Sequence, residues 1–269
     1  STGSGKTSAV ASLLQSFVKG GWAAANIVVI DPHGEYSRAL ADHASVRSVL
    51  AEGDRQLRVP FWALPAAEIV RIFAGASGGA TFMSRFNELV TGARREFVRA
   101  ASWLRLEESA VTADTPVPFD VRRVWHQLDA ENHETRRSKS EAATACVSDP
   151  GDAQKLRPAQ YEPYGPGGQA PHKGPLHDVY GTMPDLLRLG LLNPQLRFFQ
   201  EPAGQADGGD PLVEVMQEWL GKERPMSVLD FSGVPAAAAD VAIGVILNLL
   251  SEVPLRSERS GPGIGRPSP

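Results

Sequence analysis

The chain has 269 residues, a formal net charge of -4 at pH 7 and a hydrophobic fraction of 42%, values typical of a globular protein with one or two domains. This acidic balance excludes a uniformly basic coat for nucleic acid, although it allows a local basic groove. Because Cys146 is the one cysteine, an internal disulfide framework and a cysteine-cluster zinc site are excluded. Neither a transmembrane run nor a signal-peptide pattern occurs, so we expect a cytoplasmic protein without a membrane segment.

A glycine-rich loop stands at the beginning of the chain. Its sequence, S-T-G-S-G-K-T, matches the last seven positions of the phosphate loop G-x-x-x-x-G-K-[ST], whose first glycine would precede Ser1. Glycines let backbone amides face phosphate oxygens, lysine supplies a cation, and the threonine hydroxyl is a ligand for Mg²⁺. We therefore expect ATP and Mg²⁺ as cofactors, with Mg²⁺ on Thr7. The phosphates would be held by Thr2, Gly3, Ser4, Gly5, Lys6, Thr7 and Ser8.

The next residues are expected to continue as a helix and a strand. Residues 6–19 carry apolar side chains at helical spacing before two glycines, and 26–31 (N-I-V-V-I-D) are typical of a buried parallel strand that ends in a carboxylate. This order favours a nucleotide site over a chance glycine-rich turn. Because a phosphate loop also needs a strand before it, we expect the sequence to be a fragment that binds ATP poorly and hardly hydrolyses it.

An acidic turn follows that strand. Residues 31–36 read D-P-H-G-E-Y, and the proline and glycine turn the chain at the strand's carboxyl end, where open α/β sheets bind ligands. Asp31 and Glu35 are therefore candidates for orienting the attacking water or for holding Mg²⁺ through water. In the structural alternative, Asp31 caps the turn and His33 only satisfies hydrogen bonds.

Together, the loop at 1–7 and V-V-I-D-P-H-G-E-Y-S at 28–37 resemble the HerA helicase family of hexameric DNA-translocating ATPases, which is related to FtsK. Residues 114–120 and 228–235 are also similar to segments of bacterial members. The resemblance implies an α/β fold, a P-loop NTPase core with a mainly parallel sheet flanked by helices and an all-helical insertion. It further implies ATP hydrolysis, a homohexamer, double-stranded DNA as a partner, and a NurA-like nuclease or another effector.

The middle of the chain is expected to form the insertion. Residues 81–106 place apolar side chains on one helical face, and residues 119–132 predict a second helix. The other face of the first helix would meet a DNA channel, or it is a solvated face balanced by glutamates. This face is assigned Arg94, Arg95, Arg99 and Arg105. Residues 148–184 are rich in proline and glycine, which predicts a long mobile loop.

The last part of the chain is expected to return to the core, with a helix from residue 211, a strand at 226–230 and an apolar helix at 236–253. Asp230 ends its strand as a Walker B acid would, but no second acid follows it. The resemblance implies that the Walker B strand comes after Pro269 and that Asp230 is a sheet-edge residue near the site. An arginine finger is implied too, but no motif identifies it.

We therefore predict five segments: the amino-terminal core (1–64), the helical insertion (65–147), the loop (148–184), the return to the core (185–256) and an unpatterned tail (257–269). The predicted function is an ATP-hydrolysing DNA translocase, with Lys6, Asp31 and Glu35 as the catalytic candidates. Two alternatives stay open: a P-loop switch or kinase, and a non-catalytic interaction module that nucleotide stabilises.

Overall fold

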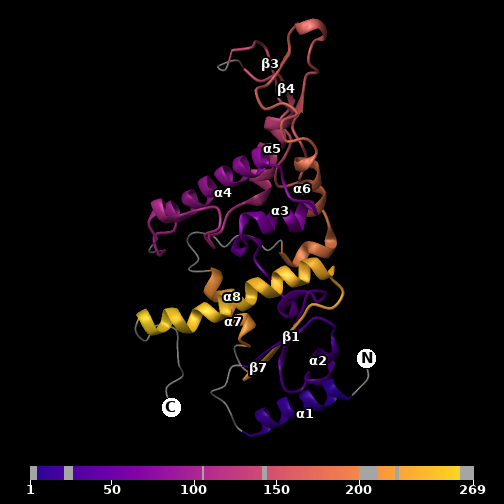
Figure 1. The fold of residues 1–269 in the computed structure, drawn as a ribbon, viewed down its shortest axis with the longest axis vertical. Helices are drawn as coiled ribbons and strands as arrows, with labels where there is room; N and C mark the ends of the chain where they lie inside the picture. Colours follow the sequence, from indigo (N-terminus) through magenta and orange to yellow (C-terminus); the bar gives the residue numbers. More distant parts are fainter. Residues whose placement is uncertain are drawn as a thin grey trace. The chain divides into compact units, whose positions relative to one another are not determined.

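The computed structural model describes residues 5–20, 27–104, 106–140, 144–199, 211–221 and 224–260 (Figure 1). Contacts divide the chain into two compact units. Unit 1 consists of Ser1–Val59 and Asp210–Pro269, and unit 2 consists of Pro60–Gly209. Unit 2 is therefore an insertion in the sequence of unit 1.

Unit 1 contains a parallel sheet of three strands in the order β1-β7-β2. These strands are β1 (Ile27–Asp31), β7 (Met226–Asp230) and β2 (Ser45–Ser48). β7 pairs with both neighbours in parallel, and all five of its residues are buried. A strand that is paired on both edges and covered on both faces is mostly apolar and shows no alternation of polar and apolar residues, as in M-S-V-L-D. The predicted α/β class and parallel sheet are confirmed.

Helices flank this sheet: α1 (Lys6–Lys19), α2 (Glu35–Ala39), α7 (Pro211–Trp219) and α8 (Ala236–Ser260). Figure 1 shows α1 and α8 on opposite sides of β1 and β7. Ala11 of α1 belongs to a buried cluster with Leu40, Met226 and Val228, and Leu14 and Val18 pack against it. The apolar face predicted for this helix is therefore confirmed only in part, because Val10, Leu13 and Phe17 are exposed. α8 continues to Ser260, past its expected end at residue 253.

Unit 2 is built mainly from α3 (Ala66–Ala74), α4 (Ala80–Ala100), α5 (Val121–His133) and α6 (Met183–Leu191). α3 packs closely on α6, where a Cβ atom at Gly190 would lie 1.7 Å from the carbonyl oxygen of Phe73. Trp125 of α5 is buried, and its Nε1 donates a hydrogen bond to the carbonyl oxygen of Pro184, 3.0 Å away. By their contacts, the described residues 185–199 group with unit 2, whereas the sequence places them in the segment 185–256 that returns to the core.

Short strands also occur in unit 2, so an all-helical insertion is not confirmed. β3 (Thr135–Arg136) pairs with β6 (His172–Lys173), and β4 (Val147–Asp149) pairs with β5 (Gln160–Tyr161), both antiparallel. Three of these four strands lie wholly or partly in the segment predicted to be a loop. Periodicity missed them because strands of two or three residues have no repeat to detect.

Arg94 does not lie on an exposed basic face, which corrects the prediction for α4. Its side chain is fully buried and donates to the carbonyl oxygens of Trp62 and Ala113 at 2.8 and 2.7 Å. Burial lowers the pKa of Arg94 to about 10. Exposed Arg99 forms an ion pair with Glu108 at 2.7 Å. This pair agrees with the alternative of a solvated helix face on which glutamates balance the arginines. Arg105 lies outside the described residues, and α4 ends at Ala100 rather than 106.

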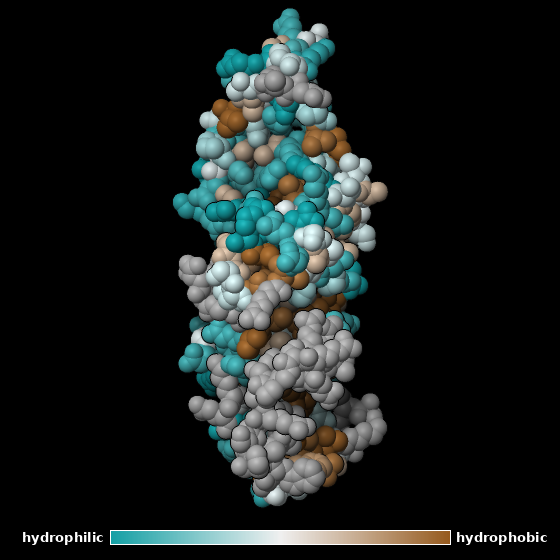
Figure 2. Space-filling view, turned by 90° about the vertical axis from the view of Figure 1, so that its left-hand side faces the viewer, coloured by the Kyte–Doolittle hydropathy of each residue, from teal (hydrophilic) through white to brown (hydrophobic). Residues whose placement is uncertain are grey.

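The surface has mixed polarity. On the face shown in Figure 2, hydrophilic residues cover much of the described surface and hydrophobic residues form separate patches. None of the described helices combines the length and the apolar character that crossing a bilayer requires.

Candidate functional site

The amino end of α1 has the features of an anion-binding site. Gly5 precedes the helix with a φ of 71°, a left-handed conformation that favours glycine, and no side chain caps the first turn. The first turn also has no acidic residue. Its backbone N–H groups and the positive end of the helix dipole therefore have no anionic partner within the helix, which suits phosphate.

The predicted phosphate-binding residues are described only in part. Thr2, Gly3 and Ser4 lie outside the described residues, and the structure describes the backbone of Lys6 but not its side chain. Thr7 is half-buried and Ser8 is exposed, both in the first turn of α1. The helix that begins at Lys6, directly after Gly5, is therefore confirmed, whereas the contacts of the loop stay a prediction.

A hydrogen bond joins the two motifs of unit 1. The Thr7 hydroxyl donates to Oε2 of Glu35 over 2.5 Å, although the residues are 28 positions apart. Glu35 is exposed and is the first residue of α2, directly after β1 and its turn. The structure thus places the proposed magnesium ligand beside one carboxylate of D-P-H-G-E-Y. The sequence predicted both residues but not this bond.

Asp31 occupies a different environment from Glu35. It is 1% exposed, and its carboxylate accepts the backbone N–H groups of Glu35, Tyr36 and Ser37 at 3.1, 2.8 and 2.9 Å. This pattern is a side-chain cap for the first turn of α2. The observed contacts of Asp31 are therefore those of the alternative in which it caps the turn, and these hydrogen bonds hold Glu35 in place. His33 is exposed on the same turn.

A second acidic turn packs against the first. Asp230 is the register partner of Asp31 in the sheet, and Oδ1 of Asp230 accepts the N–H of Ser232 at 2.8 Å. Gly34 has a φ of 73°, and a Cβ atom there would lie 3.0 Å from the Ser232 hydroxyl. Glycine is needed at this position both for the left-handed backbone and for the close approach. Asp230 ends the middle strand of the three, at the carboxyl edge of the sheet.

The donor set around Thr7 can serve a magnesium–nucleotide complex. Among the described residues, no group of three or more His, Cys, Asp or Glu could hold a metal ion. Mg²⁺ usually keeps several waters and binds through one or two protein oxygens together with substrate phosphates. The Thr7 hydroxyl and the Glu35 carboxylate match that requirement, and the amino end of α1 lies next to them.

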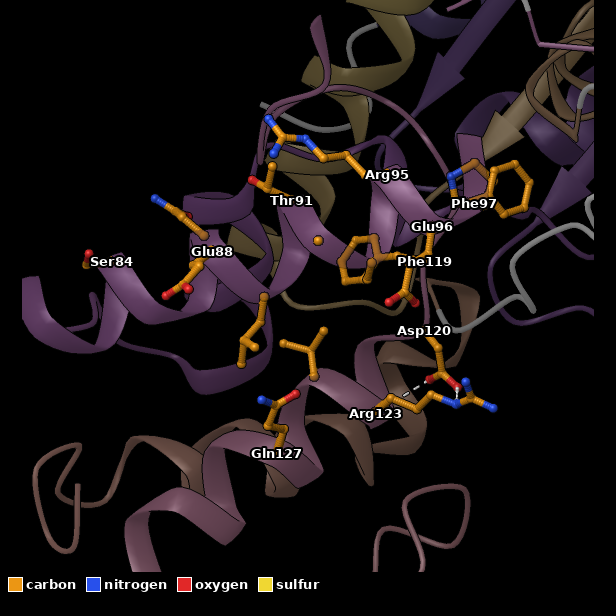
Figure 3. Close-up of a pocket in the computed structure, with 16 residues that line it drawn as sticks. Ser84, Glu88, Thr91, Arg95, Glu96, Phe97, Phe119, Asp120, Arg123 and Gln127 are labelled. Atoms are coloured by element: carbon orange, nitrogen blue, oxygen red, sulfur yellow. Dashed lines mark hydrogen bonds and ion pairs between the residues drawn. The ribbon is translucent and has the colours of Figure 1, made fainter. Parts of the chain in front are cut away.

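The large pocket drawn in Figure 3 lies elsewhere, between α4 and α5 of unit 2. Its volume is about 970 Å³, and Glu88, Arg95, Phe119 and Gln127 are among its lining residues. None of the predicted nucleotide-site residues lines it. The volume of this pocket is therefore no guide to the predicted nucleotide site.

Comparison with known proteins agrees with the two motifs. The family model described as the central domain of helicase HerA matches residues 1–160, which include the glycine-rich loop, Asp31 and Glu35. No curated protein matches the chain. The matched range covers more than half of the 269 residues, so the chain belongs to the family of the helicase HerA central domain.

Proposed function

We propose that the chain is the ATP-binding and ATP-hydrolysing part of a DNA translocase that works as a homohexamer on double-stranded DNA. The observation that carries the proposal is the 2.5 Å hydrogen bond from the Thr7 hydroxyl to the Glu35 carboxylate at the amino end of α1. Family membership supports an ATPase of the helicase type. The DNA partner, the hexamer and a NurA-like nuclease or other effector belong to the proposal.

The proposed roles follow the chemistry of phosphoryl transfer. The amides of the loop and of the first turn of α1 bind the phosphates, with Lys6 as the cation and Thr7 as the ligand for Mg²⁺. When bound, Mg²⁺ and ATP supply the electrophilic γ-phosphoryl group and neutralise charge on its oxygens. The residues assigned to phosphate binding are Thr2, Gly3, Ser4, Gly5, Lys6, Thr7 and Ser8.

The two acidic residues of the turn take different roles in this proposal. Glu35 is exposed beside Thr7, so its carboxylate can accept a proton from water or a hydrogen bond from a Mg²⁺-bound water. Asp31 is buried and accepts three backbone N–H groups, so it is a positioning residue that holds Glu35. This arrangement separates the chemical role from the structural one.

Two variants test the proposal in the natural protein that carries this sequence. Lys6→Ala should abolish ATP binding, because it removes the cation at the phosphates. Glu35→Gln keeps an oxygen that can accept from Thr7 but removes the charge, so nucleotide should still bind while turnover falls about 10²-fold or more. Glu52→Gln, an exposed glutamate of unit 1, is the control and should leave both unchanged.

The same measurements separate the alternatives. Stimulation of hydrolysis by duplex DNA supports the motor, whereas phosphorylation of a small molecule without any effect of DNA supports a kinase. Loss of turnover by Lys6→Ala with assembly intact also supports the motor. Loss of assembly with an unchanged effect on a partner would favour the non-catalytic module. Full turnover by Glu35→Gln would contradict the role proposed for Glu35.

A further inference from the structure

A second pocket of unit 2 contains ionisable groups that the nucleotide site does not use. Its volume is about 510 Å³, within the range of small-molecule sites, and it lies where the end of α5 meets β3 and β5. Asp129 and Thr135 are buried and form its inner wall, while Glu162, Tyr164 and Asp185 are exposed and form its rim. We call it the acidic pocket.

Asp129 has an unmet hydrogen-bonding requirement. The residue is 2% exposed, and its Oδ2 atom is buried without a hydrogen-bond partner in the part of the chain that the structure describes. Its Oδ1 atom lies 3.4 Å from Nδ1 of His133. A buried carboxylate oxygen without a partner is costly and uncommon, so it points to a missing donor such as a ligand or water.

The field in the acidic pocket is negative. Asp129, Asp185 and Glu162 contribute carboxylates, and the lining also includes the imidazole groups of His133 and His177. The nearby ammonium group of Lys173 is paired with Asp178. Asp129 raises the pKa of His133 to about 9, and Asp185 adds to this effect. The pKa of Tyr161, on another element, is raised by burial and by the nearby carboxylates of Glu134 and Asp129. Asp129 therefore contributes to the raised pKa of both His133 and Tyr161.

Aromatic rings complete the lining. Tyr161 and Tyr164 both line the pocket, beside Pro158 and Pro163. The ammonium group of Lys173, which is not a lining residue, lies 4.7 Å from the centre of the Tyr164 ring. Aromatic faces together with carboxylates form the usual lining of sites for organic cations, because the rings attract the charge and the carboxylates accept its N–H groups.

We propose that the acidic pocket binds the guanidinium or ammonium group of an arginine or lysine side chain presented by another polypeptide, with Asp129 accepting its N–H groups and Asp185 as a second anion on the rim. The planar guanidinium group is favoured, because it donates in a fixed fork and stacks on aromatic rings. The proposal does not rest on the function proposed for unit 1.

The test uses the whole chain and small probes followed by backbone NMR shifts. We expect N-acetyl-arginine amide to shift the signals of Asp129, Tyr161 and Asp185, and to bind at least about 10-fold more tightly than the uncharged N-acetyl-citrulline amide. N-acetyl-lysine amide should bind in the same place. Putrescine serves as the free diamine, and tighter binding of putrescine than of both amides would overturn the assignment to a polypeptide.

Variants locate the effect. Asp185→Asn, at the exposed rim, should weaken binding of the arginine amide about 2- to 5-fold, and Asp129→Asn should weaken it at least about 10-fold. Asp42→Asn, an exposed aspartate of unit 1, is the matched control and should have no effect. If Asp129→Asn does not fold, Asp185→Asn decides alone. Equal binding of citrulline and arginine amides, shifts elsewhere, or an unchanged affinity in Asp185→Asn would refute the proposal.

Discussion

The replacement Asp31→Asn tests whether this residue positions the turn or takes part in chemistry. In the structure, Oδ1 accepts the N–H of Glu35, and Oδ2 accepts those of Tyr36 and Ser37. An asparagine has one acceptor oxygen, so its amide nitrogen must face at least one of these donors. The variant loses the charge and one or more hydrogen bonds while keeping the size of the side chain.

The expected cost follows from those bonds. Hydrogen bonds to charged groups contribute about 1.5–3 kcal/mol, so we expect the free energy of opening the turn to fall by about 1–3 kcal/mol. Hydrogen exchange at the amides of Glu35, Tyr36 and Ser37 should then accelerate about 5- to 150-fold, since about 1.4 kcal/mol corresponds to a tenfold change. Turnover should fall with it, because Glu35 loses its fixed place beside Thr7.

Asp42→Asn is the control, since an exposed aspartate should change the free energy of unfolding by less than about 0.5 kcal/mol. One result would refute the positioning role. If Asp31→Asn abolished turnover while exchange at the three amides stayed at the wild-type rate, Asp31 would act on the reacting groups themselves and not through the turn.

Three further predictions concern unit 2. Gly190→Ala should lower the free energy of unfolding by about 1–3 kcal/mol or more in a urea titration, because the new Cβ atom would meet the Phe73 backbone. In the control Gly92→Ala, nothing lies within 4 Å of the new Cβ atom, so the free energy of unfolding should rise by about 0.4–1 kcal/mol. Arg94→Met should lower the free energy of unfolding by about 1–3 kcal/mol, because the carbonyl groups of Trp62 and Ala113 lose their buried donor. A change in DNA affinity of the folded variant would contradict this structural role of Arg94. The pKa of His133 is raised to about 9, so its protonated imidazole stabilises the fold fully below about pH 6.5. This contribution is about 1 kcal/mol after solvent screening, and it should vanish as the pH rises through 9. Thermal melts of the wild type and of His133→Asn should therefore converge above pH 9.

Sequence patterns located the elements whose residues repeat or stop clearly. α1 is amphipathic and ends in glycine, and β7 is a short apolar run between a proline and a turn, so both were predicted at their observed positions. β2 was missed because S-V-R-S has neither alternation nor an apolar run. It forms a strand because it pairs with β7, and Nε of Arg47 donates to the carbonyl oxygen of Glu218 at 3.2 Å.

In the candidate site too, sequence patterns predict some features and only the fold determines others. Spacing and residue type identified Thr7, Asp31 and Glu35, because the chemistry of a phosphate loop requires a hydroxyl and a carboxylate at such positions. Local spacing does not tell which of the two carboxylates accepts the backbone N–H groups of the turn. The difference between Asp31 and Glu35 arises from the turn, where three backbone N–H groups converge on Asp31 and leave Glu35 to accept from Thr7.

The order of the strands links the acidic turn to residues far along the chain. β7 pairs with β1 on one side and with β2 on the other. The three-stranded sheet therefore forms only when β7, which ends at residue 230, lies between the other two strands. The N–H of Phe231 donates to the carbonyl oxygen of Asp31 at 2.9 Å, and Ser232 packs on Gly34. The segment 230–232 thus supports the turn that carries Glu35, although it supplies no proposed catalytic group. Substitutions there should reduce activity by displacing Glu35.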